Sequence, residues 1–180
     1  IAECKDCGIS LLPPDINESG ASFTVSGENL RFGLAAVKGV GWGFVRDVLA
    51  EREKGPFRDF PDFCLRLFDH DLNKRVLENL IRCGAFDSMG VRRSQLLDAY
   101  EQLVDTIAQN KRKNLAGQFD LFGGGGDAME TAPQLVLRDI PEFSRQERMT
   151  MEMETTGLYL TGHPMDEYRA AARACRAVPI

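Results

Sequence analysis

The sequence lacks any long apolar run, and its unbroken hydrophobic stretches are only a few residues long. A membrane-spanning helix needs about 20 such residues in a row, so no transmembrane segment is predicted. No secretory leader opens the chain either, because a leader needs an apolar region of about 7–15 residues near its start. These absences favour a cytoplasmic protein that does not act at a membrane.

Histidine is scarce as well, since His70 and His163 are the only two and 93 positions separate them. No Ser–His–Asp arrangement or metal site can be assembled around either one. The five cysteines are scattered and odd in number, which favours a reducing compartment. Cys4 and Cys7 form a lone CxxC without further ligands nearby, so we interpret them as structural thiols near a helix end. With no P-loop either, the sequence predicts no catalytic centre, no metal site and no cofactor.

What the chain does have is a globular composition: 43% of its 180 residues are hydrophobic and 27% are charged. Its net charge of −5 argues against nucleic acid, but the charge is unevenly distributed. Residues 31–113 carry 15 basic and 12 acidic side chains, whereas residues 114–154 carry three basic and eight acidic ones. The chain begins at Ile1 rather than at a methionine and stops abruptly, so we expect it to be a segment of a longer protein.

Apolar periodicity predicts a mainly α fold with one small β-hairpin over residues 22–32. Helices are expected over 34–38, 44–54, 72–81 and 96–107, with one or two helical turns within 57–68. Ser144 and Glu147 have the spacing of a capping box that opens a helix through about Tyr159. Asp166 is expected to cap a last helix through Cys175. On this reading, Glu147, Glu152 and Glu154 form a solvated helix face.

The strongest motif is LAAVKGVGWG over residues 34–43, followed by an amphipathic helix. A short apolar helix, a Gly-apolar-Gly turn and a second helix form a helix-hairpin-helix pattern, here called the first hairpin. Glycines let a phosphate approach closely, and free N–H groups at the second helix's N-terminus point at the anion. Val40 would pack in the core and fix the turn. The predicted DNA-backbone contacts here are Lys38, Gly39, Val40, Gly41, Gly43 and Arg46.

A less regular second copy, the second hairpin, is predicted over residues 73–93. A helix over 73–82 leads into the turn CGAF at 83–86, and a further helix begins near residue 92. The alternative is that this region only supports the first hairpin, because its turn lacks the second glycine. If the two hairpins pair, they form a four-helix unit. The second would add the DNA contacts Lys74, Arg75, Gly84, Arg92 and Arg93.

A different kind of motif, QFDLF, lies over residues 118–122 in the glycine-rich stretch 117–134. Large apolar residues in a flexible linker are typical of short linear motifs that fill a partner's pocket. Leu121 and Phe122 would be the anchors and Gln118 the polar specificity contact, with Phe119 and Asp120 between them. The alternative is that the pair packs on the chain's own helices.

Five stretches, in order along nearly the whole chain, resemble the DNA polymerase III alpha subunits of bacteria, the C-family replicative polymerases. They are LPPDIN (12–17), RFGLAAVKGVG (31–41), NKRVLE (73–78), CGAFD (83–87) and GLYLTGHP (157–164). The resemblance implies the end of the fingers at 1–32, tandem helix-hairpin-helix elements at 33–113, and a flexible loop at 114–143. Residues 144–180 would then be a helical connector toward an OB domain.

The resemblance also implies that QFDLF is an internal sliding-clamp-binding motif, with Phe119 where leucine is common. Duplex DNA, the sliding clamp and other replicase subunits would be the partners. The metal-binding aspartates of such polymerases lie in a palm domain upstream of Ile1. This segment would therefore bind without catalysing, and the Mg²⁺ of the longer protein would be held elsewhere.

Two alternatives to a DNA-gripping and clamp-docking module stay open. The segment could be a purely structural helical connector between polymerase domains, with the hairpins as packing devices. It could also be a helix-hairpin-helix module of a DNA repair enzyme. Substituting Lys38 and Gly41 distinguishes the DNA-gripping module from the structural connector. In a DNA-gripping module the substitutions would abolish DNA binding, whereas in a connector they would affect stability alone.

Overall fold

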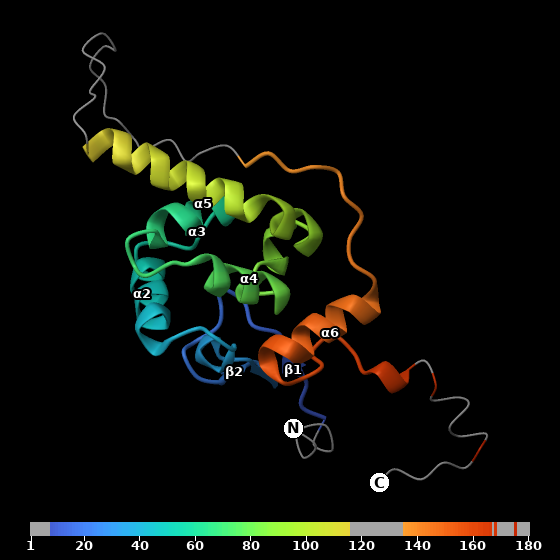
Figure 1. Cartoon of the computed structure of the whole chain (residues 1–180). Helices are drawn as coiled ribbons and strands as arrows, with labels where there is room; N and C mark the ends of the chain where they lie inside the picture. The colour runs from blue at the N-terminus through green and yellow to red at the C-terminus, as the bar shows by residue number, and fades with distance from the viewer. Residues whose placement is uncertain (1–7, 116–134, 167, 169–174, 176–180) are drawn as a thin grey trace.

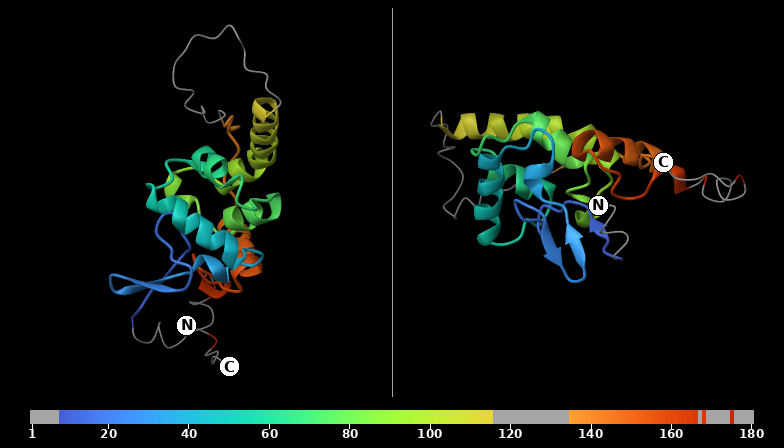
Figure 2. Two further views of the ribbon diagram at one scale, coloured as in Figure 1. Left: turned by 90° about the vertical axis from the view of Figure 1, so that its left-hand side faces the viewer. Right: turned by 90° about the horizontal axis from the view of Figure 1, so that it is seen from below.

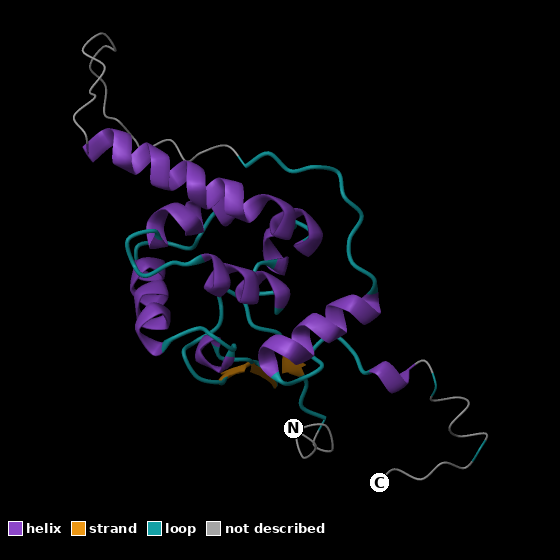
Figure 3. Cartoon of the chain, viewed as in Figure 1, coloured by secondary structure: helices purple, strands orange, loops and turns teal. Residues whose placement is uncertain are grey.

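The computed structural model describes residues 8–115, 135–166, 168 and 175. Helices dominate, and a small sheet lies at one margin of the helical unit (Figures 1 and 3). The mainly α fold with a small N-terminal hairpin is thus confirmed. None of the helices in the described ranges is both long and apolar enough to cross a membrane. Residues 1–7, which hold the CxxC, and the QFDLF motif lie outside the described residues, as does most of the expected last helix.

The sheet has three strands in the order β1-β3-β2: β1 (Leu11–Leu12), β2 (Thr24–Ser26) and β3 (Asn29–Arg31). β2 and β3 form the predicted antiparallel hairpin. Gly27 has a positive φ of 60°, which suits a two-residue turn between right-handed twisted strands. β1 pairs in parallel with β3, with Leu11 opposite Leu30, and this pairing was not predicted.

The helical elements follow the predicted order. The three longest are α2 (Trp42–Glu53), α5 (Arg93–Leu115) and α6 (Arg145–Thr156). Between them lie α3 (Phe60–Leu67) and α4 (Lys74–Arg82). The 3₁₀ turns are η1 (Leu34–Ala36), η2 (Asp87–Met89) and η3 (Pro164–Asp166). α4 packs against both α5 and α6, while both views in Figure 2 place the sheet beside the helices.

Side chains cap three of these helices at their N-termini. Asp59 caps α3, Asn73 caps α4, and Ser144 caps α6 in the predicted capping box with Glu147. The expectation that α6 runs to about Tyr159 is wrong. The helix ends at Thr156 because Gly157 adopts a left-handed φ of 75°, and its N–H caps the last turn.

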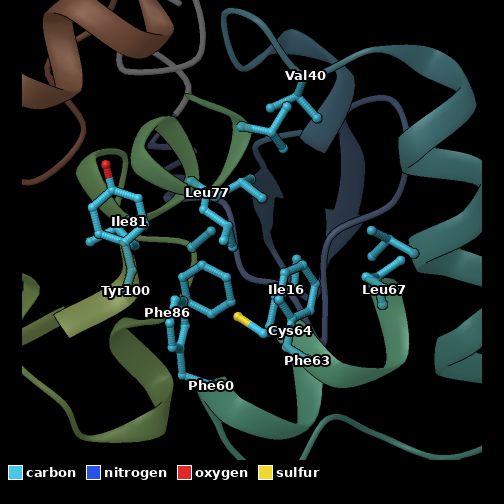
Figure 4. Close-up of a cluster of buried hydrophobic side chains, with 14 of the residues drawn as sticks. Ile16, Val40, Phe60, Phe63, Cys64, Leu67, Leu77, Ile81, Phe86 and Tyr100 are labelled. Carbon is cyan, nitrogen blue, oxygen red and sulfur yellow. The ribbon is translucent and has the colours of Figure 1, made fainter. Parts of the chain in front are cut away.

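The core is built around Phe63, which is fully buried on α3 (Figure 4). Its ring makes edge contacts with Phe57 and Phe86, both at 5.0 Å between centroids, and with Phe44 at 6.5 Å. These contacts join α2, α3 and the turn that precedes α5. The thiols of Cys64 and Cys83 lie in the same core, and burial raises the pKa of Cys83 to about 12 and that of Cys64 further. Neither thiol is reactive near neutral pH.

Candidate nucleic-acid interface

The first hairpin consists of η1, the turn at residues 37–41 and α2. Its turn is held from both sides: the Lys38 N–H donates to the Thr155 carbonyl at 2.8 Å, and Asn79 Nδ2 donates to the Lys38 carbonyl at 2.7 Å. The side chain of Val40 is buried in the core, as the sequence predicted (Figure 4). The turn is therefore fixed to α4 and α6 before any ligand arrives.

The glycines of this turn fall into two groups. Gly39 is required by the chain itself, because its φ is +79° and an added Cβ would lie 2.9 Å from Asn79 Nδ2. Gly41 and Gly43 have ordinary φ, and a Cβ added at either would meet no atom within 4 Å. Gly43 lies in the first turn of α2, where glycine costs about 0.5 kcal/mol relative to alanine. Gly41 occupies the N-cap, a position that accepts glycine, and no contact in the described fold excludes a side chain at either residue. The backbone is therefore open to close approach by a ligand at both positions.

The N-terminus of α2 is open. Its N-cap is Gly41, and no side chain caps the helix, in contrast to α3, α4 and α6. The first amides of a helix carry a partial positive charge and need an acceptor. Trp42, the only tryptophan of the chain, follows Gly41 with 65% of its surface exposed. The N-terminus of α2 is thus suited to binding an anion.

Two of the predicted cations meet beside this turn. Lys38 and Arg75 both line a polar pocket of about 370 Å³, together with Glu78, Asn79, Arg82, Glu154 and Thr155. The side chains of Lys38 and Arg75 form no ion pair with any residue that the structure describes. Arg82, in contrast, is engaged by Glu78 at 3.5 Å and by Glu154. Lys38 and Arg75 are the cations best placed to meet a phosphate.

The other predicted cations are placed less favourably. Lys74 forms ion pairs with Glu101 at 3.4 Å and Asp105 at 3.1 Å, and the hydrogen bond to Asp105 raises the pKa of Lys74. Arg46 is highly exposed on α2, and its nearest recorded partner is Asp47 at 3.8 Å. The Arg46 side chain is therefore available to bind an anion, whereas Lys74 would first have to break its ion pairs with two carboxylates.

The second hairpin differs from the first. Gly84 is needed internally, because its φ is +84° and a Cβ would collide with the Arg93 guanidinium. Arg93 is only 1% exposed and donates to Asp87 at 2.7 Å, to Glu152 at 3.1 Å and to the Arg82 carbonyl at 3.0 Å. The Arg93 guanidinium is used to hold the fold together, and Gly84 makes room for it. Neither residue is therefore available to contact DNA.

The expectation that Glu152 belongs to a solvated helix face is wrong. Its side chain is fully buried, because it accepts hydrogen bonds from the amides of Leu160 at 3.1 Å and Thr161 at 3.0 Å as well as from Arg93. Burial alone lowers the pKa of Arg93, but the hydrogen bonds and charges of Asp87 and Glu152 outweigh it and raise that pKa. The contact between Arg93 and Glu152 therefore ties α6 to the second hairpin.

Sequence reasoning missed Asn79 and Thr155, the two residues that hold the Lys38 peptide. Asn79 is 41 positions from Lys38, and Thr155 is 117 positions away. Neither lies in a local motif, so no spacing rule connects them to the turn. Among the described residues, no group of three or more His, Cys, Asp or Glu side chains could hold a metal ion.

Comparisons with known proteins agree with this geometry. A family profile described as "Helix-hairpin-helix motif" matches residues 8–96, just under half of the chain. The chain is also similar to one segment of DNA polymerase III alpha subunits. Identity is 39% with the subunit of Mycobacterium tuberculosis, 42% with that of Saccharopolyspora erythraea and 41% with that of Vibrio cholerae. These matches cover 92–99% of this chain but only 14–16% of each relative.

Proposed function

We propose that this chain grips duplex DNA by its backbone phosphates at the first hairpin, within a replicative DNA polymerase. The observation that carries the proposal is the open space at Gly41 and Gly43, where an added Cβ would meet no other atom of the described chain within 4 Å. They flank the open N-terminus of α2, where backbone amides can donate to a phosphate oxygen. Lys38 and Arg75 supply the accompanying positive charge, with Arg46 at the margin.

Such contacts carry no sequence information, because they reach only the phosphates and not the base edges. Binding should therefore be independent of sequence and should weaken steeply with salt. Template-directed synthesis with Mg²⁺ would belong to other parts of the longer polymerase, which works in the cytoplasm. The role of this segment is to hold the duplex while that synthesis proceeds.

Replacing Gly43 by alanine tests the proposal because it should move stability and binding in opposite directions. The free energy of unfolding should rise by about 0.5 kcal/mol, since alanine is the better helix former. Affinity for a 20-base-pair duplex should fall about fivefold, since a methyl group would hold the phosphate away from the amides. Duplex binding by fluorescence anisotropy and by quenching of Trp42 emission, together with a melting curve, measures both changes.

A charge-removing pair, Lys38→Ala with Arg75→Ala, should reduce the slope of log affinity against log salt by about 2. The matched control is Lys54→Ala with Arg58→Ala, which removes the same charge from exposed sites beyond the other end of α2, a helix roughly 18 Å long. Equal salt slopes in the two double variants would contradict the proposal. Unchanged binding by Gly43→Ala would do so as well.

The second candidate, a structural connector, is favoured by the ties between the first hairpin and α6. The Thr155 carbonyl accepts from the Lys38 amide, and Arg93 pairs with Glu152. If connection were the only role, neither the wild type nor the three variants above would show salt-dependent affinity for duplex, and the substitutions would change stability alone. The anisotropy titration therefore separates the two candidates.

We also propose that QFDLF at residues 118–122 docks the sliding clamp and so supports processive synthesis beside other replicase subunits. The support is the motif itself and the similarity to DNA polymerase III alpha subunits. It follows α5 in sequence, so a clamp around the gripped duplex would meet it with little search. Replacing Leu121 and Phe122 by alanine should weaken clamp binding at least tenfold, about 1.4 kcal/mol, because apolar anchors dominate small interfaces.

A calorimetric titration against a bacterial sliding clamp measures that loss, and a melting curve of the same variant is its control. The melting temperature should stay within a degree or two. Wild-type clamp affinity in the double variant would refute the docking assignment. A sharply lowered melting temperature would instead identify Leu121 and Phe122 as core residues.

A further inference from the structure

Residues 135–143, here called the strap, run as an extended segment outside the helices before α6 begins (Figure 1). The resemblance implies a flexible loop here, whereas in the structure the strap is bound to the start of α5. Gln95 Nε2 donates to the Arg138 carbonyl at 2.8 Å, and Arg138 Nε donates to Asp98 at 2.6 Å. The strap is thus attached along the first two turns of α5.

The strap places a carboxylate on the N-terminus of α5. Glu142 accepts hydrogen bonds from the amides of Arg93 at 2.9 Å and Ser94 at 3.2 Å, and also from its neighbour Phe143 at 2.8 Å. Burial alone raises the pKa of Glu142, but these three amide hydrogen bonds outweigh it and lower that pKa. A charged carboxylate therefore caps the N-terminus of α5, whereas no side chain caps the N-terminus of α2.

A second acidic residue of the strap engages the neighbouring cation. Arg92 Nη1 donates to Asp139 Oδ1 at 2.9 Å and to the Ile140 carbonyl at 2.8 Å. Asp139 is 95% exposed, so this pair lies at the surface, where exchange with other anions is easy. The amides at the start of α5 and the Arg92 side chain are thus both occupied by carboxylates of the strap.

The strap itself is held weakly. None of residues 135–143 is buried, although Leu135 packs on the edge of the core. Its attachment consists of hydrogen bonds and surface ion pairs, each of which contributes little in water. Arg93, in contrast, pairs with the exposed Asp87 and the buried Glu152, neither of which belongs to the strap. The strap can therefore leave without unfolding the second hairpin.

We propose that the strap is a built-in competitor for DNA: Glu142 and Asp139 occupy the second hairpin until phosphates of a bound duplex replace them. The inference rests on the proposed DNA grip at the first hairpin, which would bring the duplex close enough to compete. In this arrangement the second hairpin adds affinity only after the strap is displaced. Because QFDLF precedes the strap in sequence, its displacement would lengthen the tether of the clamp-binding motif.

Replacing Glu142 by glutamine tests the competition. Glutamine keeps an oxygen that can accept one amide hydrogen bond but removes the charge. Duplex affinity of the full 180-residue chain should rise about three- to fivefold, the effect expected for one charge at a helix N-terminus. The matched control is Glu147→Gln, which removes the same charge from the exposed capping box of α6 and should change affinity less than twofold.

Limited trypsin cleavage after Arg138 gives an independent readout of strap release. Cleavage should be faster in Glu142→Gln without DNA, and duplex should accelerate it in the wild type. If the wild type binds duplex but Glu142→Gln binds no more tightly than Glu147→Gln, the strap is only a helix cap and the inference is overturned, while the proposed grip stands. If neither variant nor wild type shows salt-dependent binding, the grip itself fails. Melting curves of both variants show that each is folded.

Discussion

Replacing Glu152 by alanine is expected to lower the free energy of unfolding by about 3–5 kcal/mol. The reason is that Glu152 is fully buried and accepts from Arg93, Leu160 and Thr161 at once. Its removal leaves two amides without an acceptor and leaves the buried Arg93 charge with Asp87 as its one carboxylate. Urea unfolding followed by circular dichroism measures the change.

Glu154→Ala is the matched control for this prediction. Glu154 lies two residues further along α6 and forms an ion pair with Arg82, but more than half of its side chain is exposed. An exposed ion pair contributes about 0–1 kcal/mol, so this variant should unfold almost like the wild type. If both variants lost the same stability, the buried network would not be what holds α6 in place.

Replacing Phe63 by alanine should cost about 3–5 kcal/mol, the range for a large aromatic residue deleted from a core. The ring of Phe63 touches three other phenylalanines that come from different elements, so its loss leaves a cavity that no single neighbour can fill. The expected result is a lower midpoint of urea unfolding with little change of slope.

Phe23→Ala provides the comparison. Phe23 is partly exposed beside the sheet and makes one edge contact, with Phe32 at 4.8 Å. Its removal should cost about 1 kcal/mol, the contribution of one aromatic pair near the surface. A loss for Phe63→Ala as small as this would mean that the interior repacks freely around residue 63.

Local signals in the sequence predicted most of the helices and the first hairpin. Asn73, Ser144 and the turn glycines act on neighbouring residues, so their effects can be recognised from spacing alone. The apolar stripe of α4 ends where Gly84 adopts a left-handed φ, as the pattern CGAF indicated. The Val40 side chain likewise packs inside the turn as its position between glycines predicted.

Apart from the end of α6, the misses involve partners far apart in sequence. Nothing near Glu152 in the sequence indicates that its side chain is buried. Its charged partner Arg93 lies 59 positions away. Glu142 lies 49 and 48 positions from Arg93 and Ser94, so nothing local indicated that it would cap α5. β1 contributes only two residues to the sheet, which is too short for an alternating pattern.

The tie between the Lys38 amide and the Thr155 carbonyl has a consequence for the order of events during synthesis on a ribosome. Lys38 leaves the ribosome 117 residues ahead of Thr155, an interval on the order of ten seconds at about 5–20 residues per second. During that interval the glycine turn has Asn79 as a brace but not yet α6. A nascent chain therefore completes the bracing of its glycine turn only when α6 has emerged and Glu152 has reached Arg93.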